Sequence, residues 1–247
     1  MLDYQLTEDQ KALRDLAHKI AEEKIRPVAA QYDREGTFPW DIVNVFAEAG
    51  LFGIIIPEQS GGLGLGVFEL ALVTEQLSRA CGGITLALAA SALGTFPIVI
   101  SGNDEQKARY LPELAQGKHL AAFGLTEPNA GSDAGSMRTK AVRDGDDYVL
   151  NGSKIFITNG GTAHLYTIVA VTDPTKGSRG TTAFIVQDDF PGFRVGKHED
   201  KMGIRASATN EIIFEDCRVP AVNRIGKEGE GFIVAMKTLD KSRPGVA

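Results

Sequence analysis

Residues 121–133 read AAFGLTEPNAGSD, and a second stretch, KIFITNGG, follows at residues 154–161. The first stretch is typical of a strand that runs into a turn, where hydroxyls and backbone N–H groups suit carbonyl and phosphate oxygens. In the second stretch, Phe156 and Thr158 are two residues apart and are therefore expected on the same side of a strand. An aromatic face beside a hydroxyl suits a flat, hydrogen-bonding ring. Each stretch taken alone is more often an ordinary turn or strand.

Short runs rich in β-branched and aromatic residues surround these stretches from about residue 119 onward. Asp-Gly and Asn-Gly pairs separate the runs at spacings typical of antiparallel β structure. We expect strands at 147–151, 153–158, 165–171, 182–187 and 211–214, with turns at Asp144-Gly145, Asn151-Gly152 and Asn159-Gly160.

The first hundred residues predict helices instead, because apolar residues recur at helical spacing between start and stop signals. Thr7 and Gln10 suggest a capping box, and Pro27 should interrupt the helix that follows near its end. Further helices are expected from Pro39 to Gly50, from Val67 to Ala80, and after a cap formed by Asn103 and Gln106.

The longest apolar segment, residues 84–100, falls just short of a membrane-spanning length. It contains Gly94 and Pro97, so we expect a buried helix that is broken near those residues. After Gly231 a helical pattern returns, and the sequence ends at Ala247, just inside it. The expected fold is α+β, with a helical domain at 1–118, a β domain at 119–225 and the beginning of a second helical domain at 226–247.

Composition excludes several classes of function. The net charge of -6 and the pI near 5.3 argue against a nucleic-acid surface, which needs concentrated Lys and Arg. Cys81 and Cys217 are far apart, so neither a disulfide framework nor a metal site is expected. There is no serine-hydrolase elbow, no phosphate-binding P-loop, no signal-like start and no expected membrane span. A cytoplasmic protein of a bacterium, or one of an organelle matrix, fits best.

A glycine fragment near residue 60 imitates a dinucleotide-binding turn. Residues 53–56 (GIII) are a possible strand, followed by Gly62, Gly64 and a helix at Val67. The third glycine of the fingerprint is missing, and no βαβ pattern follows. A flexible loop between helices is the better interpretation.

Taken together and in this order, the features resemble the acyl-CoA dehydrogenase family. The resemblance covers nearly the whole chain and implies an N-terminal helical domain followed by a β-barrel-like middle domain, with only the first helix of a C-terminal helical domain present. The segments that carry it are 125–133 (LTEPNAGSD), KIFITNGG, 201–220 (KMGIRASATNEIIFEDCRVP), 229–232 (GEGF) and 239–247 (LDKSRPGVA).

The resemblance implies an FAD-dependent oxidation of an acyl-CoA thioester to its trans-2-enoyl form. In the family, a carboxylate removes the α proton while the β hydrogen leaves as hydride to flavin N5. An electron-transfer flavoprotein as electron acceptor and a homotetramer are implied in the same way. Two alternatives stay open: an acyl-CoA oxidase, and a catalytically silent acyl-CoA or flavin-binding subunit of a split enzyme.

Site residues carried over from the family fall into two sets. Those expected at the flavin are Phe123, Leu125, Thr126, Ser132, Phe156, Ile157 and Thr158. Those expected at the CoA substrate are Ser132, Lys201, Asp240, Lys241, Ser242 and Arg243. Many relatives have tryptophan where Phe156 stands, so looser packing at the ring is expected.

The catalytic carboxylate is not expected in this chain. In a minority of the family it lies at the position of Ser242, and serine cannot act as that base. Glu127 lies in the flavin motif, but its counterpart in the family does not perform this role. The resemblance therefore places the base beyond Ala247, with Arg243 in support, and implies little or no turnover by the isolated chain.

Overall fold

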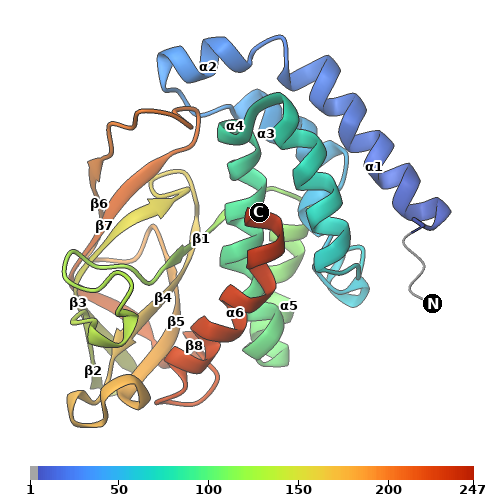
Figure 1. Ribbon diagram of the computed structural model, residues 1–247. Helices are drawn as coiled ribbons and strands as arrows, with labels where there is room; N and C mark the ends of the chain where they lie inside the picture. Colours follow the sequence, from blue (N-terminus) through green and yellow to red (C-terminus); the bar gives the residue numbers. More distant parts are fainter. Residues whose placement is uncertain (1–4) are drawn as a thin grey trace.

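The computed structural model describes residues 5–247 and places a layer of helices beside a β-sheet (Figure 1). The N-terminal helices are α1 (Glu8–Ile20), α2 (Ala29–Glu35), α3 (Trp40–Glu48), α4 (Val67–Ser101) and α5 (Asp104–Ala115). The strands are β1 (Ala121–Gly124), β2 (Lys140–Asp144), β3 (Asp147–Thr158), β4 (Leu165–Val171), β5 (Thr181–Gln187), β6 (Phe193–His198), β7 (Thr209–Pro220) and β8 (Arg224–Ile225). A last helix, α6 (Gly231–Val246), packs between α4 and the sheet. The expected α+β order is confirmed.

The sheet is mixed and does not close into a barrel. Its strand order is β6-β7-β3-β2-β4-β5-β8, with β1 attached beside β4. Most neighbours are antiparallel, but β1 and β4 run parallel, and β2 meets β4 in parallel at Lys140 and Val171. The turn signals in the sequence predicted antiparallel strands, and the consecutive pairs β2–β3, β4–β5 and β6–β7 are antiparallel. The same signals do not reveal the parallel pairs, whose strands are farther apart in the sequence.

One strand replaces two expected ones. The residues from Asp147 to Thr158 form the single strand β3, and the expected turn at Asn151-Gly152 is wrong. The pairing of β3 with β7 shifts register between Leu150 and Gly152, where Asn151 of β3 lies opposite two residues of β7, Glu215 and Asp216, so the Asn-Gly pair lies opposite a β-bulge of β7. Gly152 has a φ of 140°, a conformation that favours glycine in this irregular part of a strand as much as in a turn.

Local helix signals are confirmed. Thr7 and Gln10 form a reciprocal capping box, as do Asn103 and Gln106. The first helix gives way to a π-helical turn at Ala21–Ile25 before Pro27, as expected.

The expected break of the apolar helix near Gly94 and Pro97 is wrong. α4 instead bends at Cys81, whose φ and ψ of -162° and 111° are not helical. Gly94 is needed for packing, because a Cβ atom there would lie 2.6 Å from the Ala122 nitrogen of β1. α4 is long and apolar enough to cross a membrane, but 72% of its most apolar window is buried inside the protein, so it serves as the core helix.

The glycine fragment near residue 60 lacks the strand that a dinucleotide motif requires. Leu51–Gly53 form a 3-10 turn, and turns continue through 54–56. Gly62 lies against this turn, where a Cβ atom would stand 2.1 Å from the Ile56 carbonyl oxygen. Close packing therefore accounts for this glycine.

α5 fastens the segment that leads into α6. Gln106 Nε2 donates hydrogen bonds to the carbonyl oxygens of Val222 (2.7 Å) and Arg224 (2.8 Å). Tyr110 Oη donates to Asn223 Oδ1 at 3.0 Å, and Asn223 Nδ2 donates to the Ile185 carbonyl on β5. The start of α6 is thus positioned from both the helical layer and the sheet.

Candidate functional site

The end of β3 presents an uncovered aromatic ring. Its pairing with β7 shifts register between Lys154 and Ile157, and Phe156, inside this bulge, has a φ of 58°. Phe156 is 59% exposed, Ile157 is 2% exposed and Thr158 is half-buried. Phe156 and Thr158 therefore lie on the open side of β3, while Ile157 anchors the strand in the core.

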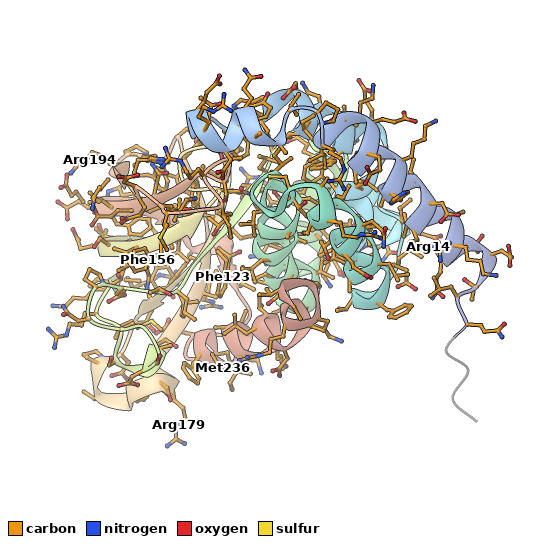
Figure 2. All side chains as sticks on the ribbon, turned by 45° about the horizontal axis from the view of Figure 1, so that its top comes forward. Arg14, Phe123, Phe156, Arg179, Arg194 and Met236 are labelled. Carbon is orange, nitrogen blue, oxygen red and sulfur yellow. The ribbon has the colours of Figure 1, made fainter. Side chains whose placement is uncertain are left out.

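The turn after β1 lies beside this bulge. The Ile155 N–H donates to the Thr126 carbonyl oxygen at 2.9 Å, which joins the turn to β3. Leu125 is buried, whereas Phe123 and Thr126 are half-buried. Figure 2 shows Phe156 on the sheet and Phe123 on β1, the strand that packs against α4.

Three hydroxyls of the sequence motifs are open to a ligand. Within residues 5–247, the side chains of Thr126, Ser132 and Thr158 make no hydrogen bond to another protein group. Ser132 is exposed in the loop before β2, which a backbone pair between Glu127 and Ala130 closes. An aromatic ring and free hydroxyls are the kinds of group that suit a flat ligand with polar edges and a phosphate chain.

A buried ion pair lies behind the open residues, and sequence reasoning did not find it. Lys154 Nζ lies 2.7 Å from Glu127 Oε1 and donates to the Leu125 carbonyl oxygen at 3.1 Å. Burial lowers the pKa of Lys154, while Glu127 opposes this. Burial alone would raise the pKa of Glu127, but the Lys154 ammonium and hydrogen bonds to Glu127 outweigh it and hold the pKa below its ordinary value. The carboxylate is therefore fully engaged and does not serve as a free proton acceptor.

Asn159, in the KIFITNGG stretch, faces the core. It is fully buried with a φ of 63°. Its Nδ2 lies within hydrogen-bond distance of the Ala87 carbonyl, the Ser91 hydroxyl and the Ala121 carbonyl, at 3.1 to 3.3 Å. The asparagine thus ties the end of β3 to α4 and β1.

Lys201 is held by its own loop between β6 and β7. Its Nζ donates to the Ser207 carbonyl oxygen at 2.5 Å and to Thr209 Oγ1 at 2.8 Å. Burial lowers the pKa of Lys201, with Asp33 of α2 acting against it. The ammonium lines a hollow of about 230 Å³ between α2 and this loop.

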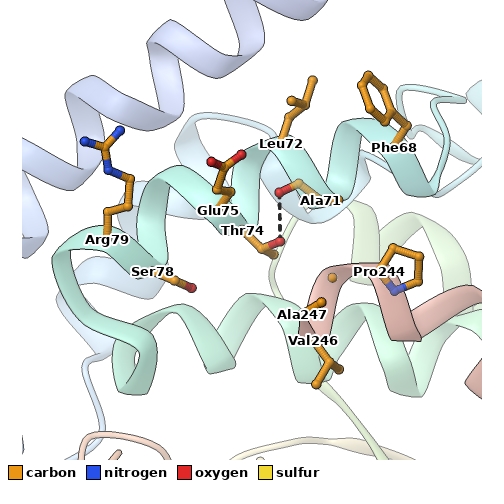
Figure 3. A pocket seen from close by; sticks show the side chains of 11 residues that line it. Phe68, Ala71, Leu72, Thr74, Glu75, Ser78, Arg79, Pro244, Val246 and Ala247 are labelled. Carbon is orange, nitrogen blue, oxygen red and sulfur yellow. Dashed lines mark hydrogen bonds between the residues drawn. The ribbon is translucent and has the colours of Figure 1, made fainter. Parts of the chain in front are cut away.

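The four expected CoA residues of α6 lie on or near its solvent side. Asp240, Lys241 and Arg243 are exposed, and Ser242 Oγ donates to the Leu239 carbonyl oxygen at 3.1 Å. Directly after them, the end of α6 and the first half of α4 enclose a groove of about 620 Å³ (Figure 3). Its lining includes Phe68, Leu72, Thr74, Glu75, Arg79 and Pro244.

The N-terminal domain model of the acyl-CoA dehydrogenase family matches residues 7–118, and its middle domain model matches residues 122–217. A short-chain specific acyl-CoA dehydrogenase of Clostridium acetobutylicum is 47% identical over 100% of this chain and 65% of its own length. The chain thus spans less than two thirds of that relative.

Solved structures agree with this match. Butyryl-CoA dehydrogenase of Megasphaera elsdenii has a TM-score of 0.96 at 44% identity, over 99% of this chain and 65% of that one. A chain in the structure of the electron transferring flavoprotein of Acidaminococcus fermentans has a TM-score of 0.97 at 48% identity, over 99% and 65%. An acyl-CoA dehydrogenase complexed with FAD, from Bacillus anthracis, has a TM-score of 0.89 at 35% identity, over 98% and 41%.

Proposed function

The chain belongs to the acyl-CoA dehydrogenase family, and we propose that it forms the helical and β-sheet part of an FAD-dependent enzyme that oxidises an acyl-CoA thioester to trans-2-enoyl-CoA. The observation that carries the proposal is the uncovered ring of Phe156 on a strand that also bears the unpartnered hydroxyl of Thr158 and is hydrogen-bonded to the segment of Thr126. The FAD in the Bacillus anthracis relative supports the choice of cofactor.

In this proposal the chain's residues bind and orient the cofactor. Phe156 contributes an aromatic face, and Thr126 and Thr158 contribute hydroxyl donors along the ring edge. Phe123, Leu125 and Ile157 line the same region, and Ser132 contacts phosphate and the substrate's pantetheine arm. When bound, FAD would supply the acceptor for the hydride that leaves the β carbon of the substrate.

The substrate's CoA portion is assigned to two other regions. Asp240, Lys241, Ser242 and Arg243 present polar groups along α6, and Lys201, held by Ser207 and Thr209, lines the hollow between α2 and the loop from β6 to β7. We place the carboxylate that removes the α proton beyond Ala247. Ser242 is not an acid, and Glu127 is engaged by Lys154. Arg243 supports that base in our assignment.

We assign an electron-transfer flavoprotein as the electron acceptor and a homotetramer as the assembly. The similarity to a chain in an electron transferring flavoprotein structure supports the first assignment. We also assign the protein to the bacterial cytoplasm or an organelle matrix.

A two-step experiment on the full-length protein, which would supply the carboxylate placed beyond Ala247, tests the proposal. The apoprotein is titrated with FAD while flavin fluorescence is followed, and butyryl-CoA is then added without oxygen while the visible flavin absorbance is recorded. We expect saturable FAD binding followed by bleaching of the flavin. Failure to bind FAD, or FAD that stays oxidised with acyl-CoA substrates of several chain lengths, overturns the proposal. Rapid peroxide formation in air identifies an oxidase instead.

A further inference from the structure

The ion pair behind the open site reaches three separate segments of backbone. Lys154 is fully buried in β3, and its ammonium binds Glu127 and the Leu125 carbonyl oxygen. Glu127 Oε2 accepts from the Arg138 N–H at 2.6 Å, and Oε1 accepts from the Thr139 N–H at 3.0 Å. The pair therefore links the turn after β1, the residues before β2, and β3.

These links adjoin the two segments of the candidate site, which carry Thr126 and Phe156. Glu127 directly follows Thr126, and Lys154 is the last residue of β3 in register before the bulge that exposes Phe156. The Ile155 N–H, next to Lys154, donates to the Thr126 carbonyl oxygen and so gives a second link between the same two segments. One backbone hydrogen bond and one buried ion pair thus join the segment of Thr126 to the segment of Phe156.

The lysine stem packs closely beside β1. At Gly124, a Cβ atom would stand 3.4 Å from Lys154 Cγ, which is ordinary van der Waals contact, and 2.5 Å from Ile168 Cδ1, which is a clash. Gly124 is therefore needed for packing against Ile168 of β4, and the stem of Lys154 lies next to it.

Stability alone does not explain this arrangement. Replacing a buried ion pair with apolar residues of similar volume is often neutral or stabilising, because removing two charges from water is costly. Phe156, on the other hand, adopts a left-handed conformation that bulky residues avoid, and such a conformation persists only where its surroundings enforce it. The ion pair of Lys154 and Glu127 lies at the start of the bulge, where it can hold the backbone of Phe156 in this conformation.

On the basis of the proposed function, we propose that Lys154 and Glu127 are positioning residues for FAD. They fix Thr126 and Phe156 relative to each other, so that loss of either charge weakens FAD binding and alters the surroundings of the bound ring beyond its effect on the fold. Neither side chain touches the cofactor in this assignment. Their action passes through the Leu125 carbonyl and the bulge.

The test compares Lys154→Met, Glu127→Gln and the double variant in the full-length protein, with and without FAD. The measurements are the FAD dissociation constant, the visible circular dichroism of bound FAD, and urea unfolding of the apoprotein. We expect each single variant to bind FAD about tenfold more weakly, because it leaves a buried charge without its partner. The double variant is expected to lose less than the product of the two single losses.

The matched control removes an exposed ion pair of the same sheet. Arg194 on β6 and Glu215 on β7 lie 2.6 Å apart on the surface. Arg194→Met and Glu215→Gln are expected to leave FAD binding and the visible spectrum unchanged, since exposed pairs contribute little.

A milder variant keeps the test decisive if the first ones do not fold. Glu127→Asp retains the charge but is one methylene shorter, so it cannot reach both Lys154 and the Arg138 N–H. We expect severalfold weaker FAD binding and a changed visible spectrum. Wild-type affinity and spectrum in these variants, or losses no larger than their unfolding energies predict, overturn the positioning role. Failure of the wild-type protein to bind FAD overturns the proposed function instead.

Discussion

The backbone of α4 at Gly94 lies against the backbone of β1 at Ala122, with no room for a methyl group between them. Thr167 on β4 adds a hydrogen bond from its hydroxyl to the Gly94 carbonyl oxygen at 3.0 Å. The helical layer and the sheet are thus in direct main-chain contact, on the strand that leads into the candidate site.

Gly94→Ala should destabilise the protein although alanine favours helices. The new Cβ meets backbone atoms of β1, which cannot rotate away, and overpacking of this kind costs about 1 to 3 kcal/mol. Gly82→Ala is the control, because a Cβ there meets no atom within 4 Å. The control should keep its free energy of unfolding or gain up to about 1 kcal/mol. Equal unfolding free energies for the two variants in urea would contradict the close contact.

Phe156→Gly should separate stability from cofactor binding. Glycine relieves the left-handed backbone, which offsets its greater freedom in the unfolded chain, so the free energy of unfolding should stay within about 1 kcal/mol of wild type. Loss of the aromatic face should weaken FAD binding about tenfold. Val142→Ala, at a 61% exposed position of β2, should change neither quantity. Wild-type FAD affinity in Phe156→Gly would remove this ring from the site.

The carboxyl group of Asp173 should lose its low pKa when Lys176 is replaced. Hydrogen bonds from Lys176 and Thr175 lower the pKa of Asp173 from 3.8 to about 2. Because the folded state favours the ionised form, this contribution to stability is present above pH 3.8 and is lost as the pH falls toward about 2. In Lys176→Met, an NMR titration should show the pKa of Asp173 moving up toward 3.8.

Arg179→Met is the control for that titration. Arg179 is an exposed cation of the same turn and is not among the groups that shift Asp173. Its removal should leave the titration of Asp173 unchanged. The same low pKa in Lys176→Met as in wild type would show that the ion pair is not formed in solution.

Cys217 should resist thiol reagents until the protein unfolds. It is fully buried on β7, and burial raises the pKa of its thiol to about 12, so the reactive thiolate is scarce at neutral pH. Cys81 is only half-buried. Mass spectrometry should find label on Cys81 alone in the native protein and on both cysteines in urea. A native Cys81→Ser variant that still takes up label rapidly would refute the burial of Cys217.

Signals that act over a few residues were readable from the sequence. The capping boxes at Thr7 and Asn103 need only a partner three residues away, and both are present. Asn151-Gly152 misled because a dipeptide that suits a turn can also lie within a strand opposite a bulge of its neighbour, and pairing with β7 decides between the two. Gly94 misled for a similar reason: a distant strand, which no local pattern reveals, determines its role.

The candidate site was predictable in part. The two-residue spacing identified Phe156 and Thr158 as neighbours on one side of β3, and their exposure agrees with that arrangement. The left-handed backbone of Phe156 follows from the register shift, which depends on β7. The pair of Glu127 and Lys154 spans 27 residues, so only the folded chain brings it together.

The bonds of Gln106 and Tyr110 to the segment before α6 have a consequence for modularity. Cutting the chain between the helices and the sheet would strip the Val222 and Arg224 carbonyls of their donors and leave Tyr110 without its acceptor. Each severed piece would also expose the apolar surface that the other now covers. The boundary between the two layers is therefore a poor place to divide the gene for separate expression.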